Sequence, residues 1–172
     1  MTAQRIFITG SADGLGRLSA QALLAAGHHV IVHARSTRRL EAVRDLLDQG
    51  AVGVVGDLAV PAEVRDVAAQ VLALGVPDAV IHNAAVLSGA TLLPVNVVAP
   101  YLLTALLRTP RRHIYLSSAM HTGGRARLDG LDWDGRRATA SYSDTKLLVT
   151  TLMAAVARLW PDVASNGVNP GW

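Results

Sequence analysis

Short runs of β-branched residues alternate with longer amphipathic stretches along the whole chain, and this alternation constrains the fold more than any other feature. The extended runs are residues 5–9, 29–33, 52–55, 78–82, 113–117 and 163–168. Apolar residues at helical spacing fill the stretches 15–26, 37–49, 61–73, 95–107 and 141–159. Strands joined through helices of this length form parallel pairs with right-handed crossovers. We therefore predict an α/β fold with three layers, a doubly wound parallel sheet covered by helices on both faces.

Composition supports one well-packed domain over residues 1–172. Hydrophobic residues make up 51% of the chain and charged residues 17%, which excludes a disordered polypeptide. There is no cysteine, so disulfides and thiolate metal sites are excluded. No apolar run reaches the roughly 18 residues that a membrane span needs, and the first residues lack a signal-peptide pattern. We expect a cytoplasmic protein without a membrane partner.

The net charge of +3 does not predict a nucleic-acid partner. The densest basic pairs, at 38–39, 111–112 and 136–137, lie far apart, and the chain has a single Phe. Nucleic-acid surfaces require a clustered basic stripe or an aromatic stacking platform. A solvated, arginine-rich surface is the better interpretation.

A glycine-bearing loop joins the first strand to the first helix, with the sequence Thr9-Gly10-Ser11-Ala12-Asp13-Gly14-Leu15-Gly16. Glycines at such a junction allow a tight turn and a close backbone approach to a pyrophosphate, which the helix N-terminus attracts. The spacing is G-x-x-x-G-x-G rather than the more general G-x-G-x-x-G, and a purely structural turn is the alternative. The strand–loop–helix context favours a dinucleotide site.

The second strand leads into Arg35 and Ser36, where a dinucleotide fold meets the adenosine ribose. A guanidinium and a hydroxyl suit a ribose 2′-phosphate, whereas an acid would bind the free 2′-hydroxyl. This predicts NADP(H) in preference to NAD(H), with an ordinary surface arginine as the alternative. Asp13 in the glycine loop argues modestly the other way.

Tyr142 and Lys146 lie four residues apart on one predicted helix and so share a face. An ammonium near a phenol lowers the pKa of the phenol and makes it a usable acid–base. The pattern Y-x-x-x-K is weak alone, but Lys146 is the only lysine among sixteen basic residues. Arginine cannot replace a compact ammonium with an adjustable pKa. Chance survival of one lysine is the alternative.

Together these motifs resemble the short-chain dehydrogenase/reductase family, over essentially the whole chain. They occur in the family's order: Thr9 to Gly16, Asp57-Leu58, Asn83-Ala84-Ala85, Asn96, Ser117-Ser118, Tyr142-x-x-x-Lys146 and Pro170-Gly171. Ser-Ser-x-x-His at 117–121 and the long interval to Tyr142 look most like retinol-dehydrogenase-type carbonyl reductases. The resemblance implies a Rossmann fold and hydride transfer between NADP(H) and a carbonyl or secondary alcohol.

The family's residue roles carry over to matching positions. Tyr142 would be the acid–base, Lys146 would hold the nicotinamide ribose, Asn96 would anchor a relay water, and Ser118 would polarise the carbonyl, with Ser117 as the competing assignment. The implied cofactor-binding residues are Thr9, Gly10, Ser11, Asp13, Gly14, Leu15, Gly16, Arg35, Ser36, Asp57, Leu58, Asn83, Ala84, Ala85, Tyr142, Lys146, Pro170 and Gly171.

The sequence departs from the family at its end. It stops two residues after Pro170, where relatives continue into a further strand and a substrate lid, so we expect the last strand and the lid to be missing. The alternative function is therefore a non-catalytic dinucleotide-binding remnant, or a fragment of a longer enzyme. In the family, helices like those carrying Asn96 and Tyr142 often pack against a second subunit, so a homo-oligomer is possible. His33, His82 and His121 lack metal-ligand spacing and are interpreted as packing or loop residues, and we expect no metal.

Overall fold

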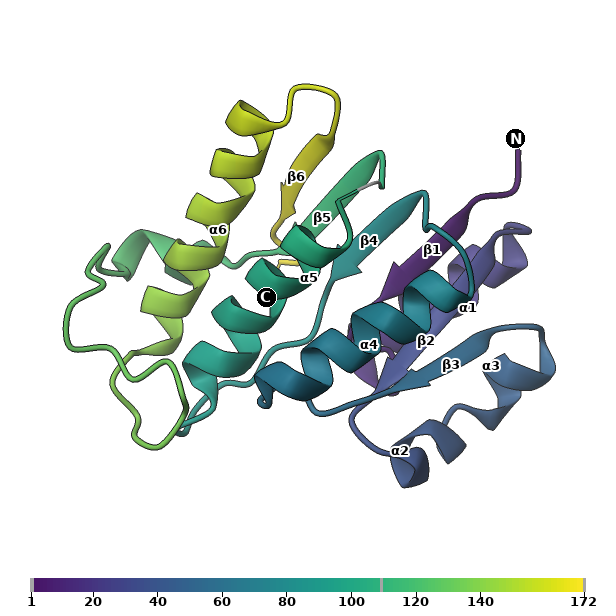
Figure 1. Ribbon diagram of the computed structural model, residues 1–172, viewed down its shortest axis with the longest axis horizontal. Coiled ribbons are helices and arrows are strands. Elements are labelled where there is room, and N and C mark those ends of the chain that lie inside the picture. The colour runs from purple at the N-terminus through teal and green to yellow at the C-terminus, as the bar shows by residue number, and fades with distance from the viewer. Residues whose placement is uncertain (1, 109, 172) are drawn as a thin grey trace.

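A six-stranded parallel sheet forms the centre of the computed structural model, which describes residues 2–108 and 110–171. The strands are β1 (Arg5–Ile8), β2 (His29–Ala34), β3 (Val52–Val55), β4 (Ala79–His82), β5 (Arg112–Leu116) and β6 (Ala164–Val168). Their order is β3-β2-β1-β4-β5-β6, and every neighbouring pair is parallel (Figure 1). The doubly wound α/β prediction is confirmed, and the order reverses between β1 and β4.

Helices cover both faces of this sheet. They are α1 (Gly14–Ala25), α2 (Thr37–Glu41), α3 (Arg44–Asp48), α4 (Pro61–Ala73), the π-helix η1 (Pro94–Val98), α5 (Ala99–Leu106), the 3-10 helix η2 (Ala119–Gly123) and α6 (Tyr142–Leu159). Side chains alternate along β1, so Phe7 packs with α4 and α5 on one face. Ile6 and Ile8 pack with α1 and α3 on the other. Removing two such apolar surfaces from water is the main force that holds the layers together.

The predicted single helix over 37–49 is wrong, because the chain breaks into α2 and α3 at Val43. Tight backbone bonds join Val43 N to Leu40 O and Leu46 N to Val43 O. The break places both Val43 and Leu46 in the core, each with no exposed surface.

The helix predicted at 95–107 begins instead as the π-helix η1 and continues as α5. Pro100 has no N–H to donate to the carbonyl four residues back. The Ala99 N–H reaches five residues back to Pro94 O. This widened turn contains Asn96, and such turns recur at functional sites.

One edge of the sheet is β6, which pairs with β5 and is mostly exposed. Within the described ranges 2–108 and 110–171, no helix has both the length and the apolar character that a membrane span requires.

Candidate functional site

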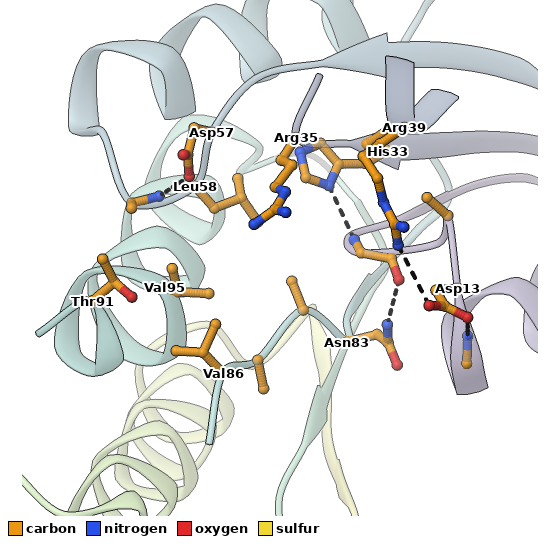
Figure 2. Close-up of a pocket in the computed structure, with 17 residues that line it drawn as sticks. Asp13, His33, Arg35, Arg39, Asp57, Leu58, Asn83, Val86, Thr91 and Val95 are labelled. Atoms are coloured by element: carbon orange, nitrogen blue, oxygen red, sulfur yellow. Dashed lines mark hydrogen bonds and ion pairs between the residues drawn. The ribbon is translucent and has the colours of Figure 1, made fainter. Parts of the chain in front are cut away.

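The carboxyl ends of β1 to β4 surround a cavity of about 680 Å³, at the point where the strand order reverses (Figure 2). Open α/β sheets bind ligands at such a crevice. Predicted cofactor residues that line the cavity are Gly10, Asp13, Gly14, Arg35, Asp57, Leu58, Asn83, Ala84 and Ala85.

The other predicted residues lie outside this lining, and several have structural roles instead. Thr9 and Ser11 are buried, and their side chains bond within the protein. Ser36 accepts a bond from the Arg39 amide and caps α2. The remaining predicted residues outside the lining are Leu15, Gly16, Asn96, Ser118, Tyr142, Lys146, Pro170 and Gly171.

Hydrogen bonds tie the glycine loop to the loop after β4. The Thr9 hydroxyl accepts bonds from the backbone amides of Asn83 and Ala84, each at 3.0 Å. The Asn83 side-chain amide donates to Thr9 O at 2.9 Å and to Gly10 O at 3.1 Å. The two strands at the reversal of the sheet are thereby joined on the floor of the cavity.

Two glycines of the loop are required by space and backbone shape. Gly10 has φ +62°, and a Cβ there would lie 2.9 Å from Ala84 Cα. A Cβ on Gly16 would collide with the side-chain amide of Asn83. Side chains at either position would force the two loops apart.

Helix α1 presents its N-terminus to the cavity. Asp13 caps the helix, because its carboxylate accepts a 2.7 Å bond from the Gly14 amide. Gly14 has φ +50°, and a Cβ there would meet nothing within 4 Å. Open space at a glycine beside a helix N-terminus fits the approach of a phosphate group.

Two arginines lie in the cavity wall, and sequence reasoning found only Arg35. Arg39, on the first turn of α2, also lines the cavity, and its Nη2 lies 3.4 Å from Asp13 Oδ2 (Figure 2). The Gly14 amide and then Arg39 lower the pKa of Asp13. The sequence feature that could have indicated Arg39 is its position. It lies one helical turn after Ser36, where the second strand was predicted to lead into the next helix. Arg39 is paired with Asp13, and Arg35 adds a second guanidinium to the same cavity lining.

Asp57 lies on the opposite part of the rim, at the end of β3. Its carboxylate accepts a 2.9 Å bond from the Ala59 amide, and its own amide donates to Glu63 at 2.7 Å. Val86 and Val95 add an apolar wall that sequence reasoning also missed. A polar floor with one apolar side fits a dinucleotide, which has phosphates, riboses and flat rings.

Helix α6 carries the Tyr142–Lys146 pair from its first turn. Ser141 and Asp144 form a reciprocal capping box that starts the helix at Tyr142. The Lys146 ammonium lies 5.4 Å from the centre of the Tyr142 ring and donates a 2.6 Å bond to Leu116 O. The two side chains share a face, as the spacing predicted.

Burial, rather than attraction between the two side chains, shifts the pKa values of Tyr142 and Lys146. It lowers the pKa of Lys146 to about 8 and raises the pKa of Tyr142. The predicted lowering of the Tyr142 pKa is therefore not found here.

Asn96 links the cavity wall to α6. It is buried, its Oδ1 accepts from the Val86 amide at 2.8 Å, and its Nδ2 donates to Val86 O at 2.9 Å. The same Nδ2 donates to the Thr145 hydroxyl at 3.1 Å. Val86 lines the cavity, and Thr145 precedes Lys146, so one side chain joins the two parts of the site.

The two neighbouring serines at the end of β5 differ in their surroundings. Ser117 Oγ lies 2.7 Å from the Thr150 hydroxyl on α6. Ser118 caps η2, where its oxygen accepts from the Met120 amide at 3.2 Å, so its own O–H stays available to donate. This geometry favours Ser118 for a contact with substrate.

The three histidines considered in the sequence have structural places. His33, His82 and His121 all make hydrogen bonds inside the protein, which confirms their interpretation as packing or loop residues. Across residues 2–108 and 110–171, no group of three or more potential ligands is placed to hold a metal ion.

Sequence comparisons give consistent relatives. The family model described as short chain dehydrogenase matches residues 4–105. A short-chain dehydrogenase of Penicillium rubens and an uncharacterized oxidoreductase of Emericella nidulans are each 36% identical over 98% of this chain. The chain spans about 70% of the length of these fungal relatives. Human retinol dehydrogenase 13 is 28% identical over 96% of this chain and 58% of its own.

Solved structures share the fold. A short-chain dehydrogenase from Streptomyces avermitilis aligns over 99% of this chain and 66% of its own, with TM-score 0.79 and 25% identity. A gluconate 5-dehydrogenase from Burkholderia cenocepacia, in complex with NADP and tartrate, covers 100% of this chain and 72% of its own, with TM-score 0.81 and 22% identity. The fold and the matched sequence lead to one conclusion: this chain belongs to the short-chain dehydrogenase/reductase family of oxidoreductases.

Proposed function

We propose that the protein transfers hydride between NADP(H) and a carbonyl compound or secondary alcohol, with Tyr142 as acid–base. The main support for this proposal is the set of hydrogen bonds made by the Asn96 side chain. It joins Val86 in the cavity wall to Thr145, the neighbour of Lys146, and so fixes the Tyr142 helix relative to the cavity. Hydride transfer and protonation of one carbonyl group need the nucleotide and the proton donor to be held in a fixed geometry, and these bonds help to hold it.

The cavity residues fit a nicotinamide dinucleotide. The open space over Gly14 at the start of α1 suits the pyrophosphate, and Asp57 suits the adenine. Arg35 and Arg39 suit a ribose 2′-phosphate, which supports the preference for NADP(H). Bound there, the cofactor would supply the hydride.

The other roles follow from the side chains around α6. Burial raises the pKa of Tyr142 and keeps the phenol protonated at neutral pH, as a proton donor for carbonyl reduction must be. Ser118 offers a free O–H to the carbonyl oxygen. Lys146 has a pKa of about 8, so most of it is charged at pH 7 and can donate a hydrogen bond to a ribose hydroxyl.

The substrate class is a small-molecule carbonyl compound or the matching alcohol. Support comes from the stretch Ser117 to His121, which resembles retinol-dehydrogenase-type carbonyl reductases, and from the relative named retinol dehydrogenase 13. A Streptomyces relative, 30% identical, is named as a putative ketoreductase. These likenesses favour carbonyl chemistry over other substrates of the family.

The decisive test is Tyr142→Phe, assayed for NADPH binding by fluorescence and for reduction of an aldehyde and ketone panel. We expect binding within about twofold of wild type and a rate at least about 100-fold lower, the usual worth of a positioned proton donor. Tyr101→Phe, on an exposed residue of α5, is the matched control and should behave as wild type. Saturable NADPH binding without any wild-type reduction would instead favour the non-catalytic dinucleotide-binding alternative.

Arg35→Asp tests the cofactor preference. An acid at this position should repel a 2′-phosphate and accept a free ribose hydroxyl, so the NADPH/NADH affinity ratio should fall at least about tenfold. Arg38→Asp, one residue from Arg39, is the charge-matched control. An unchanged ratio in Arg35→Asp would refute the assignment of Arg35 to the phosphate.

A further inference from the structure

His33 lies in the cavity lining between the glycine loop and the end of β3. It belongs to β2, is 3% exposed, and lines the cavity near Arg35 and Arg39 (Figure 2). Its Nδ1 lies 3.0 Å from the Gly10 amide nitrogen, and its Nε2 lies 2.8 Å from Gly56 O. One imidazole therefore connects the glycine loop to the end of β3.

These two bonds determine the protonation state of the ring. The Gly10 N–H can only donate, so Nδ1 must be unprotonated, and Gly56 O can only accept, so Nε2 must carry the proton. His33 is thus neutral, in its Nε2–H form. A second proton would place two N–H groups against each other at Gly10 and break that contact.

The backbone of His33 is held as firmly as its ring. Its amide donates to the Ser11 hydroxyl at 2.7 Å, and its carbonyl accepts from the Ser11 amide at 3.1 Å. Ser11 Oγ in turn donates to Ile8 O at 2.9 Å. The ring itself is restrained by its burial and by the bond to Gly56 O, so breaking its Gly10 bond should displace the loop.

The walls joined by His33 are those proposed to hold the two ends of one nucleotide. Gly10 precedes the phosphate-facing part of the loop, and Gly56 precedes Asp57 on the adenine side. We propose that neutral His33 is a positioning residue that sets the distance between these walls, so that nucleotide binding weakens when His33 takes up a proton. This inference rests on the proposed nucleotide binding and adds its dependence on acidity.

Charged groups around the ring come from every adjoining element. Asp57 lies after β3, Arg35 at the end of β2, Arg39 on α2, and Asp13 in the loop after β1. Burial lowers the pKa of His33, and the Gly56 bond and Asp57 partly oppose it. The transition should therefore fall on the acid side of 6.5.

The experiment measures the Kd of NADH and NADPH between pH 8 and pH 4.5. NADH is the main probe, because the 2′-phosphate of NADPH itself titrates near pH 6. We expect the wild-type Kd to rise with acidification, approaching about tenfold per pH unit below the imidazole pKa. Far-UV circular dichroism at each pH restricts the comparison to folded protein.

Two variants separate the two bonds of the ring. His33→Asn retains an acceptor near the Nδ1 position for Gly10 but does not titrate, so its Kd should stay flat with pH. His33→Gln places its amide nearer the Nε2 position and should lose the Gly10 bond, with a Kd at least about tenfold higher at every pH. His29→Asn, at the exposed start of β2, should follow the wild-type profile.

The imidazole nitrogens and the Gly10 amide, observed by ¹⁵N NMR in the chain without nucleotide, give an independent readout. They should show the Nε2–H form at neutral pH and a linked change on acidification. A wild-type NADH profile parallel to that of His33→Asn would overturn the inference while leaving the proposed function intact. No binding of either nucleotide at pH 8 would overturn the proposed function, and this inference with it, whatever the NMR shows.

Discussion

The two halves of the sheet are held together in different ways. In the glycine-loop half (β1 to β4 with α1 to α4), strands such as β1 and β2 are buried in two apolar clusters. In the Tyr142 half (β5, β6 and α6), four of the five residues of β6 are exposed. There α6 is anchored by polar contacts, including Asn96 to Thr145 and Ser165 to Met153 O.

This difference predicts different consequences of mutation. Side-chain substitutions in the Tyr142 half should leave buried polar groups without partners and therefore lower stability. Substitutions in the glycine loop should change the shape of a surface that the apolar core already supports, and so should affect binding more than folding. Variants in the two halves should therefore separate effects on stability from effects on binding.

Asp144→Ala should lower the free energy of unfolding by about 2–4 kcal/mol, because it removes a buried carboxylate that accepts part-buried bonds from the amides of Ser141 and Arg125. Urea denaturation measures this effect. Asp45→Ala, which removes an exposed carboxylate bonded to Arg17, is the control and should change stability by less than about 1 kcal/mol. Equal losses in the two variants would contradict the polar anchoring of α6.

Asp144 should also make stability fall in acid. Burial raises its pKa, but the backbone bonds from Ser141 and Arg125 outweigh that effect, so the pKa of the folded state lies below 3.8. Its contribution is therefore complete above the unfolded pKa and disappears as pH falls through the folded one. The Asp144→Ala variant should lack that part of the acid slope.

Lys146→Met should remove a rise in stability at alkaline pH. The pKa of Lys146 is about 8 in the folded chain and 10.5 as the ordinary value. Between these limits the unfolded state binds more protons, so wild-type stability should gain up to about 3 kcal/mol relative to the variant. The measurement is the difference between the two unfolding curves from pH 7.5 to 10. A constant difference would mean that the ammonium is not buried in solution.

Gly16→Ala and Gly14→Ala should separate folding from binding. The first puts a Cβ against the Asn83 amide and should cost about 1–3 kcal/mol of stability. The second meets open space inside the protein and should cost about 1 kcal/mol for its positive φ alone. If a phosphate lies over Gly14, NADPH affinity should still fall at least about tenfold in Gly14→Ala. Wild-type NADPH affinity in Gly14→Ala would contradict the placement of a phosphate over Gly14.

Asp13→Asn should have the smallest effect on stability, because its ion pair with Arg39 is exposed. Removing the competing carboxylate should raise NADPH affinity a few-fold and leave NADH nearly unchanged. Both affinities can be read from one fluorescence titration series. A larger gain in affinity for NADH than for NADPH would indicate that Asp13 repels a part of the nucleotide other than the 2′-phosphate.

The sequence predicted the strands and the glycine loop well, because both depend on local patterns. Residues 61–73 formed the predicted helix, whose N-terminus is marked by Pro61. The break at Val43 was not predictable, because it arises from packing against strands distant in sequence. Tertiary packing commonly overrides local helical preference.

Within the site, the missed features were contacts between distant segments. Arg39 became relevant only when the position of α2 brought it to Asp13, 26 residues away. His33 was recognised as a loop hydrogen-bonding residue, but its partners Gly10 and Gly56 are each 23 residues away. The sequence predicted a lowered pKa for Tyr142, but burial of the phenol raises that pKa. The spacing of a motif does not report burial.

The closed hydrogen bonds around Gly10 have a thermodynamic consequence. Its N–H is bonded to His33 and its C=O to Asn83, so the loop already has a defined shape in the chain alone. A binding surface that is preorganised loses little conformational entropy when a ligand arrives. We therefore expect loop ordering to contribute little to the entropy of nucleotide association, which leaves the flexible dinucleotide as the partner that loses most of its freedom.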